Sequence, residues 1–427
     1  MFMEQTYFIL SIVIFILVYA LIIWDKFDRA VVAMSGAVLM ILLRVMNQEE
    51  AFGAIDFNTI GLLIAMMIIV MIMRHTGIFE YLAIIMVKAS GANPFKLMVI
   101  MAFTTGIISA FLDNVTTILL MLPILLSVTK DLKLNPIPFI ISAVFGSNVG
   151  GTATLIGDPP NIMIGSKAGL SFVDFLVNDA VICIPLLVVT SFVFALIFRK
   201  QLVASAEDKA KVLALNEKDC IKDSLLLKKG IFVFAFVVVG FLLHGLLHYE
   251  SGTIAIAGAV VLLFISGKNS EEILVDVEWK TIFFFSGLFI LVGGIEATGV
   301  IAMLAGGVID LTQGNLMLTT LAILWVSAIA SAFIDNIPFV ATMIPMIIEM
   351  GQLSDINIMP LWWALSLGAC LGGNGTAIGA SANVVAIGMA DREGYHISFG
   401  SYFKIAFPVM LLTIVIATVY MLFAYLL

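Results

Sequence analysis

The sequence predicts an all-α polytopic membrane protein built from two inverted-topology repeats, each with five transmembrane helices and one re-entrant helical hairpin. Three observations lead to this fold class. Of the 427 residues, 62% are hydrophobic and 12% are charged, whereas soluble globular chains have roughly 45–50% and about 25%. Several apolar runs approach the roughly 18–20 residues with which a helix crosses a bilayer. The third observation is an internal repeat with a constant separation.

This repeat keeps one register over most of the chain. The string Ser109-Ala-Phe-Leu-Asp113-Asn114 returns as Ser331-Ala-Phe-Ile-Asp335-Asn336, a separation of 222 residues (335 − 113). At the same offset, Gly150-Gly151, Thr154 and Asn161 match Gly372-Gly373, Thr376 and Asn383. The chain is therefore divided into a first repeat (1–198), a linker (199–229) and a second repeat (230–427).

The apolar segments of the first repeat predict five full crossings. They fall at about residues 7–24, 30–43, 60–73, 137–157 and 180–198. A sixth segment, 97–129, has Asp113-Asn114 at its centre, so we expect a hairpin that enters and leaves by one face, with a second hairpin at 316–350. Broken helices are expected at 137–165 and 360–390. Five crossings per repeat place equivalent elements in opposite directions, as in many secondary transporters.

The positions of Lys and Arg predict the orientation in the cell membrane, inner or plasma. With an outer amino terminus, 19 of the 21 basic residues lie inside, and only Arg44 and Lys167 lie outside. The linker, with eight cations against five acids, is then cytoplasmic. Both termini are expected to be extracytoplasmic, and no basic patch indicates a nucleic-acid partner.

The hairpin tips are the first candidate site. An ionised Asp at membrane depth costs several kcal/mol unless it faces a cavity, a cation or a partner. Asp113 and Asp335 are in this position, each beside an Asn at a break in the helix. Helix capping alone is the alternative interpretation. The candidate solute- and ion-binding residues of the two tips are Asp113, Asn114, Thr116 and Thr117 in the first, and Asp335 and Asn336 in the second.

Two glycine-rich breaks are the second candidate site. Glycines permit irregular backbone, whose free carbonyls bind cations, while helix amino termini favour oxygen-rich or anionic solutes. Packing of small residues is the alternative. The candidates are Asn148, Gly150, Gly151, Thr152, Thr154, Asp158 and Asn161 in the first repeat, and Gly372, Gly373, Asn374, Thr376, Ser381 and Asn383 in the second. Because Asp158 has only Ala380 as its counterpart, we expect a cation or proton site around Asp113, Asn148, Thr152 and Asp158.

The strings SAFLDNVTTILLMLP, SNVGGTATLIGDPPN, SAFIDNIPFVATMIP and GACLGGNGTAIGASANVV give the chain a family resemblance. It resembles the arsenite permease and sodium/proton antiporter group of the ion transporter superfamily, and within it the melanosomal P protein branch. The resemblance implies a scaffold part and a transport part, a homodimer and an elevator-type movement. It places the ion and solute sites at the hairpin tips and broken-helix loops named above.

The resemblance implies a secondary active transporter of a small inorganic solute, and arsenite or antimonite efflux driven by the proton gradient is the first expectation. A permanent Asp at each tip disfavours a multiply charged anion by charge repulsion, whereas uncharged arsenous acid fits. The alternatives are a carrier of anions or organic acids such as dicarboxylates and citrate, or a Na⁺/H⁺ antiporter.

We expect no enzyme activity, because the chain lacks the second motif of intramembrane aspartyl proteases and a His-Glu-x-x-His zinc site. No cofactor and no metal site are expected, apart from Na⁺ or H⁺ as coupling ion. The expected partners are the solute, the lipid bilayer, a second copy of the chain and, for an arsenite pump, a soluble ATPase subunit.

Overall fold

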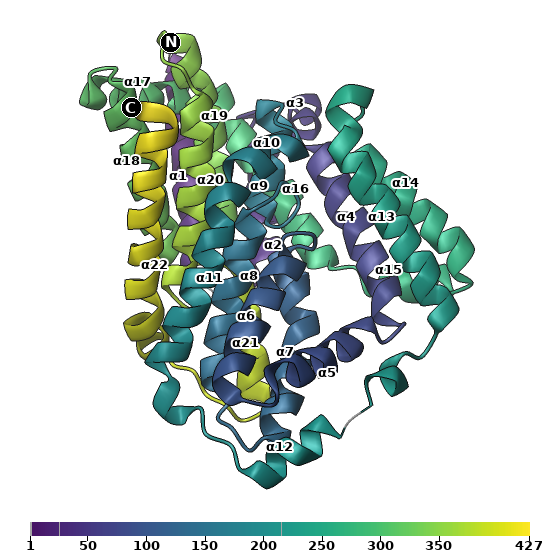
Figure 1. Cartoon of the computed structure of the whole chain (residues 1–427). Coiled ribbons are helices and arrows are strands. Elements are labelled where there is room, and N and C mark those ends of the chain that lie inside the picture. Colours follow the sequence, from purple (N-terminus) through teal and green to yellow (C-terminus); the bar gives the residue numbers. More distant parts are fainter. Residues whose placement is uncertain (1, 25, 215) are drawn as a thin grey trace.

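The computed structural model describes residues 2–24, 26–214 and 216–427, and the described residues form helices and connecting turns without a strand (Figure 1). The predicted all-helical fold class is therefore confirmed. The helices of the first half are α1 (Phe2–Trp24), α2 (Arg29–Leu42), α3 (Gln48–Ala54), α4 (Phe57–Arg74), α5 (Ile78–Ser90), α6 (Pro94–Ser109), α7 (Asn114–Asp131), α8 (Ile137–Thr152), α9 (Pro159–Ala168), α10 (Phe172–Asn178) and α11 (Ala180–Ile197).

The second half repeats this order after a short polar connection. The connection holds two 3-10 turns (Arg199–Gln201 and Glu217–Cys220) and α12 (Ala206–Leu213). The remaining helices are α13 (Ser224–Leu247), α14 (Ser251–Ser266), α15 (Ser270–Val275), α16 (Trp279–Ala297), α17 (Val300–Thr312), α18 (Leu316–Phe333), α19 (Asn336–Leu353), α20 (Met359–Gly372), α21 (Ser381–Arg392) and α22 (Phe399–Met421), with a 3-10 turn (Gly373–Gly375) after α20 and a π-helical turn (Leu422–Leu426) after α22.

The 222-residue register extends to the helix boundaries. The first residues of α1 to α9 and of α13 to α21 are separated by 222 positions throughout, from Phe2 and Ser224 to Pro159 and Ser381. One prediction is corrected here, because α13 begins at Ser224, inside the stretch 199–229 assigned to the linker. Asp223 accepts a hydrogen bond from Leu226 N at 2.8 Å and so starts the helix earlier than the change in polarity suggests.

Two pairs of helices turn back within the membrane. α6 and α7 meet at Asp113, and α18 and α19 meet at Asp335. Among the described residues, eight helices are long and apolar enough to span a membrane, and they include α7 and α18. Each of these two is nevertheless one arm of a hairpin, so helix length alone does not count the crossings. The short helices α5 and α17, which precede the hairpins, are not in the predicted set of elements.

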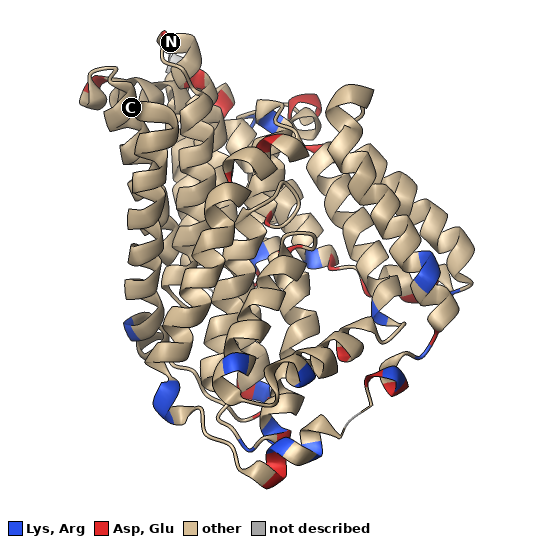
Figure 2. Cartoon of the chain, viewed as in Figure 1, with Lys and Arg blue, Asp and Glu red and all other residues tan. Residues whose placement is uncertain are grey.

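Both termini lie at one end of the molecule, and α12 lies at the opposite end (Figure 1). Most Lys and Arg residues gather near the α12 end (Figure 2). This distribution is the one from which the cytoplasmic side was predicted. On the side of the bundle formed by α13, large apolar side chains such as Phe232, Phe236 and Leu246 are exposed, as expected for a surface in contact with lipid.

Candidate functional site

The carboxylate at each hairpin tip caps the helix that follows it. Asp113 Oδ1 accepts a hydrogen bond from Thr116 N at 2.9 Å, and Asp335 Oδ1 accepts one from Ile337 N at 3.1 Å. Both carboxylates are buried. The capping interpretation is therefore correct for both residues, and each carboxylate still has a second oxygen available for another partner.

Four buried asparagines join the two repeats at the centre of the molecule. Asn148 Oδ1 accepts a hydrogen bond from Asn114 Nδ2 at 3.1 Å. The Asn148 amide donates to Asn374 Oδ1 at 3.0 Å and to Asn383 Oδ1 at 2.9 Å. The tip of the first hairpin, α8 and the second glycine-rich break are thus connected through one side chain. The sequence predicted all four residues as site residues but not their contact.

Equivalent asparagines hold the two broken helices open. Asn161 Nδ2 donates to the carbonyl oxygens of Thr152 and Thr154, both at 3.0 Å. Its repeat partner Asn383 Nδ2 donates to those of Gly373 and Thr376, both at 2.8 Å. Carbonyls freed at a break have no helical partner and no water in a membrane. The two amides satisfy them, which explains why an Asn occurs at this position in both repeats.

The paired glycines allow the broken helices to approach the hairpins closely. A Cβ on Gly150 would lie 2.0 Å from the Gly106 carbonyl oxygen, and one on Gly372 would lie 2.4 Å from that of Ala328. Real side chains never come so near to backbone atoms. Packing is therefore part of their role, as the alternative interpretation of the glycine motif expected. The adjacent Gly151 and Gly373 face the backbone of Gly157 and Gly379 in the same way.

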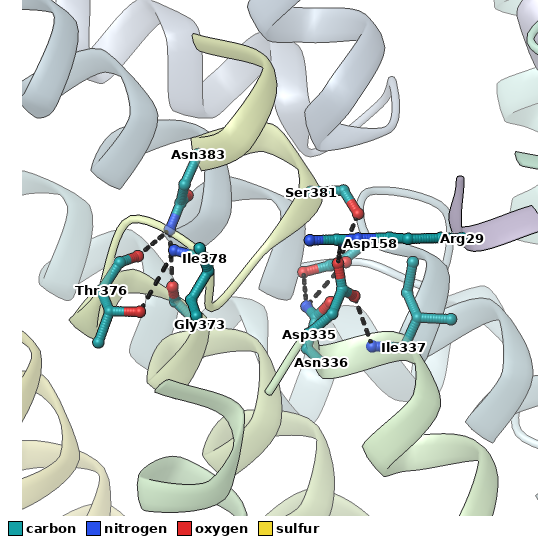
Figure 3. A network of polar contacts seen from close by, with 10 residues as sticks. All are labelled: Arg29, Asp158, Asp335, Asn336, Ile337, Gly373, Thr376, Ile378, Ser381 and Asn383. Atoms are coloured by element: carbon teal, nitrogen blue, oxygen red, sulfur yellow. Dashed lines mark hydrogen bonds and ion pairs between the residues drawn. The ribbon is translucent and has the colours of Figure 1, made fainter. Parts of the chain in front are cut away.

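An ion pair that the sequence analysis missed lies at the second tip (Figure 3). Arg29, the first residue of α2, places its Nη1 2.8 Å from Asp335 Oδ2, and Ser381 Oγ donates to the same oxygen at 2.7 Å. Asn336 Nδ2 donates to the two oxygens of Asp158 at 3.4 and 3.3 Å. Arg29 was predicted only as a cytoplasmic cation, because its position before an apolar run gives no sign of a partner 306 residues away.

The remaining predicted residues are buried without a ligand-like arrangement of their own. Thr152 Oγ1 donates to Asn148 O within its own helix, and the hydroxyls of Thr154 and Thr376 bond to backbone carbonyls of the hairpins. The hydroxyls of Thr116 and Thr117 and the Asn374 amide nitrogen are buried without a hydrogen-bond partner. These three groups are the unused polar atoms among the predicted site residues.

A cavity of about 440 Å³ opens beside the first tip. The amino-terminal ends of four helices reach it, since Val115 of α7, Pro159 of α9, Ile337 of α19 and Ser381 of α21 line its wall. The ionisable residues of its wall are Asp28, Arg29, Asp113, Glu278 and Lys280. Helix amino termini carry partial positive charge and free N–H groups. Four of them together with two cations make a site for oxygen-rich anions, balanced by carboxylates that can also hold a cation.

A multi-pass helical bundle with two hairpins, two broken helices and a polar cavity between the repeats is the architecture of a membrane transporter. The comparisons with known proteins agree with this class and give the family. Residues 19–368 match the model of the CitMHS family, described as citrate transporters. The chain therefore belongs to the CitMHS citrate transporter family.

Several curated proteins resemble the whole chain. A 46 kDa membrane protein of Mycobacterium leprae is 41% identical over 98% of this chain and 99% of that protein. An uncharacterized transporter of Mycobacterium tuberculosis is 42% identical, with 97% and 98% covered. The P protein of Mus musculus is 35% identical over 96% of this chain but only 59% of its own length. The resemblance to the P protein is confirmed, while the family model found is that of citrate transporters and not of arsenite permeases.

A solved structure gives the same fold. The YdaH transporter of Alcanivorax borkumensis aligns with a TM-score of 0.56 over 91% of this chain and 89% of that chain, at 14% sequence identity. At this identity the likeness concerns the fold alone, and it agrees with the predicted superfamily fold.

Proposed function

We propose that the chain is a secondary active transporter that carries an anionic organic acid of the citrate class. The observation that carries this proposal is the cavity, where four helix amino termini, Arg29 and Lys280 meet. A tricarboxylate or dicarboxylate needs many N–H donors and compensating positive charge. The membership of a citrate transporter family supports the same class of solute.

This proposal replaces arsenite efflux, the first expectation, by its alternative. The argument for arsenite was that a fixed negative charge at each tip repels a polyanion. Arg29 pairs with Asp335 at 2.8 Å, which offsets one of these charges, and Asp113 is bonded to the amino terminus of α7. Both tips therefore tolerate an anion better than the sequence suggested. Uncharged arsenous acid would make no use of the cations of the cavity.

The acids that remain in the cavity suggest a coupling cation. Asp113 lines the wall without a basic partner among the described residues, and Glu278 shares this wall. We propose that such carboxylates neutralise a cation that travels with the anion. Asp158, whose printed side-chain partner is the amide of Asn336, belongs to the same proposal. Replacing Asp158 by Asn should change the Na⁺ or pH dependence of uptake, and an unchanged dependence would remove Asp158 from it.

The orientation and the transport movement are also proposals. The cationic end with α12 would be cytoplasmic, so the first hairpin opens from the inside and the second from the outside. Arg29 of α2 and Asp335 of the second hairpin would then belong to the scaffold part and the transport part. Alternating access in a homodimer by an elevator-type movement would require this pair to separate.

Binding of citrate to the purified protein tests the function. We expect citrate to bind by isothermal titration calorimetry, and arsenite not to bind. Lys280→Gln removes a cation of the cavity whose side chain is largely exposed, so its folding should be intact while citrate binds about two- to fivefold more weakly. Arg74→Gln, an exposed cation at the end of α4, should bind as the wild type does. Binding of arsenite alone, or equal affinities in all three proteins, would refute the proposal.

A further inference from the structure

A buried carboxyl group outside the proposed solute site has not been assigned a role so far. Asp179 lies between α10 and α11, and its solvent exposure is 0%. Its Oδ2 is within hydrogen-bond distance of Ser366 Oγ on α20, while its Oδ1 has no partner. In the described part of the chain no Lys or Arg pairs with it. An ionised carboxylate in such a place would be uncompensated and costly.

The hydrogen bonds around Ser366 decide where the protons are. Ser366 Oγ is also 2.7 Å from Asn161 Oδ1. The orientation of the Asn161 amide follows from its two bonds to the Thr152 and Thr154 carbonyls, because only its nitrogen can donate to them. Its repeat partner Asn383 has the same arrangement. The side facing Ser366 is therefore an oxygen, which only accepts.

Three oxygens in a row at hydrogen-bond distance need two hydrogens between them. Ser366 has one hydroxyl hydrogen and Asn161 Oδ1 has none. The hydroxyl is used for Asn161, so the hydrogen between Ser366 and Asp179 must belong to the carboxyl group. This count requires a neutral Asp179 that donates to Ser366 in the conformation described here.

We propose that Asp179 is a proton-binding site whose occupancy controls the break between α8 and α9 through Ser366 and Asn161. On deprotonation the O–H bond of the carboxyl breaks, the electron pair stays on the carboxylate and the proton passes to water. The Ser366 hydroxyl then turns to donate to the carboxylate, and Asn161 Oδ1 loses this donor. Because Asn161 holds two carbonyls of the break, the break becomes looser when the proton leaves. Coupling of this event to transport rests on the proposed function.

The groups that face Asp179 leave its proton as the one that can move. They are Cys183 on its own helix, Cys370 on α20, and Tyr420 and Tyr425 near the carboxyl end of the chain. The two tyrosine hydroxyls donate to the oxygen atoms of the adjacent Asn178. Asp158 is the next acid and interacts with Cys370 rather than directly with Asp179. Carboxyl groups ionise far more readily than thiols and phenols.

Infrared difference spectroscopy at neutral pH tests the protonation without any transport assay. The wild type should show the carbonyl stretching band of a buried carboxylic acid, and Asp179→Asn should lose it. Asp310→Asn, which changes an exposed acid of α17, should keep the band. An identical spectrum of the wild type and Asp179→Asn would overturn the proposal, whether or not citrate is the solute.

Hydrogen–deuterium exchange tests the link to the break. In the wild type, protection of residues 152–161 should fall as the pH rises, after correction for intrinsic exchange. Protection should be independent of pH in Asp179→Asn, whose amide donates to Ser366 permanently, and in Ser366→Ala, which keeps the acid but breaks the link. In proteoliposomes, Asp179→Asn should exchange solute as the wild type does and lose accumulation driven by a pH gradient. Unaltered pH dependence in both variants, or full accumulation in Asp179→Asn, would refute the coupling.

Discussion

Replacing Arg29 by Gln tests the ion pair that joins α2 to the second hairpin. The two charged atoms are 2.8 Å apart, and the Asp335 side chain is only 2% exposed. Removing one partner of a fully buried pair costs about 3–5 kcal/mol. Because the Arg29 side chain is 20% exposed and Asp335 keeps its bonds from Ser381 and Ile337, we expect a loss of about 2–3 kcal/mol.

A double-mutant cycle separates the pair from other contacts of Arg29. Arg29→Gln, Asp335→Asn and the double variant are unfolded reversibly in mixed micelles, and the free energies of unfolding are compared. We expect a coupling energy of about 1–2 kcal/mol, since a neutral Asn no longer needs the cation. Arg74→Gln should change the free energy of unfolding by less than about 0.5 kcal/mol. Strictly additive losses for Arg29 and Asp335 would refute the argument.

Three further predictions follow from the packing, the asparagine network and the linker. Gly150→Ala should cost at least about 3 kcal/mol by forcing two backbones apart, whereas Gly306→Ala, with open space around it, should be neutral or stabilising in thermal unfolding. Asn148→Ala should abolish transport and lower the melting temperature, because each buried amide left unpaired costs about 1–3 kcal/mol; normal uptake would contradict the network. The pKa of Asp208 is lowered by its hydrogen bond from Ser205 and then by a neighbouring lysine. The stability this gives to α12 is present above the usual carboxyl range and lost as pH falls through the lowered pKa, so amide exchange in α12 should speed up in acid and an acid-independent rate would count against it.

The repeat made much of the fold predictable. A constant separation of 222 residues located both hairpins and both broken helices, because the same interruption of an apolar run recurs in each repeat. The boundary at Ser224 was missed because helix capping by Asp223 begins within a polar stretch. The short helices α5 and α17 were missed because they are too short to form recognisable spans.

The candidate site was predictable where polarity interrupts apolar sequence. Asp113, Asp335 and Asn148 are conspicuous for this reason, and they lie at the tips and in the central network. Arg29 and Asp179 were missed, since each stands at the end of an apolar run where charged residues are common. Their roles depend on partners 306 and 187 residues away, and only the tertiary fold brings these together.

Uptake by proteoliposomes under an imposed pH gradient tests the central claim most directly. Labelled citrate and labelled arsenite are offered in parallel to the wild type and to empty liposomes. The account predicts accumulation of citrate that collapses when the gradient is dissipated, with arsenite at the level of empty liposomes. Accumulation of arsenite without citrate would contradict it.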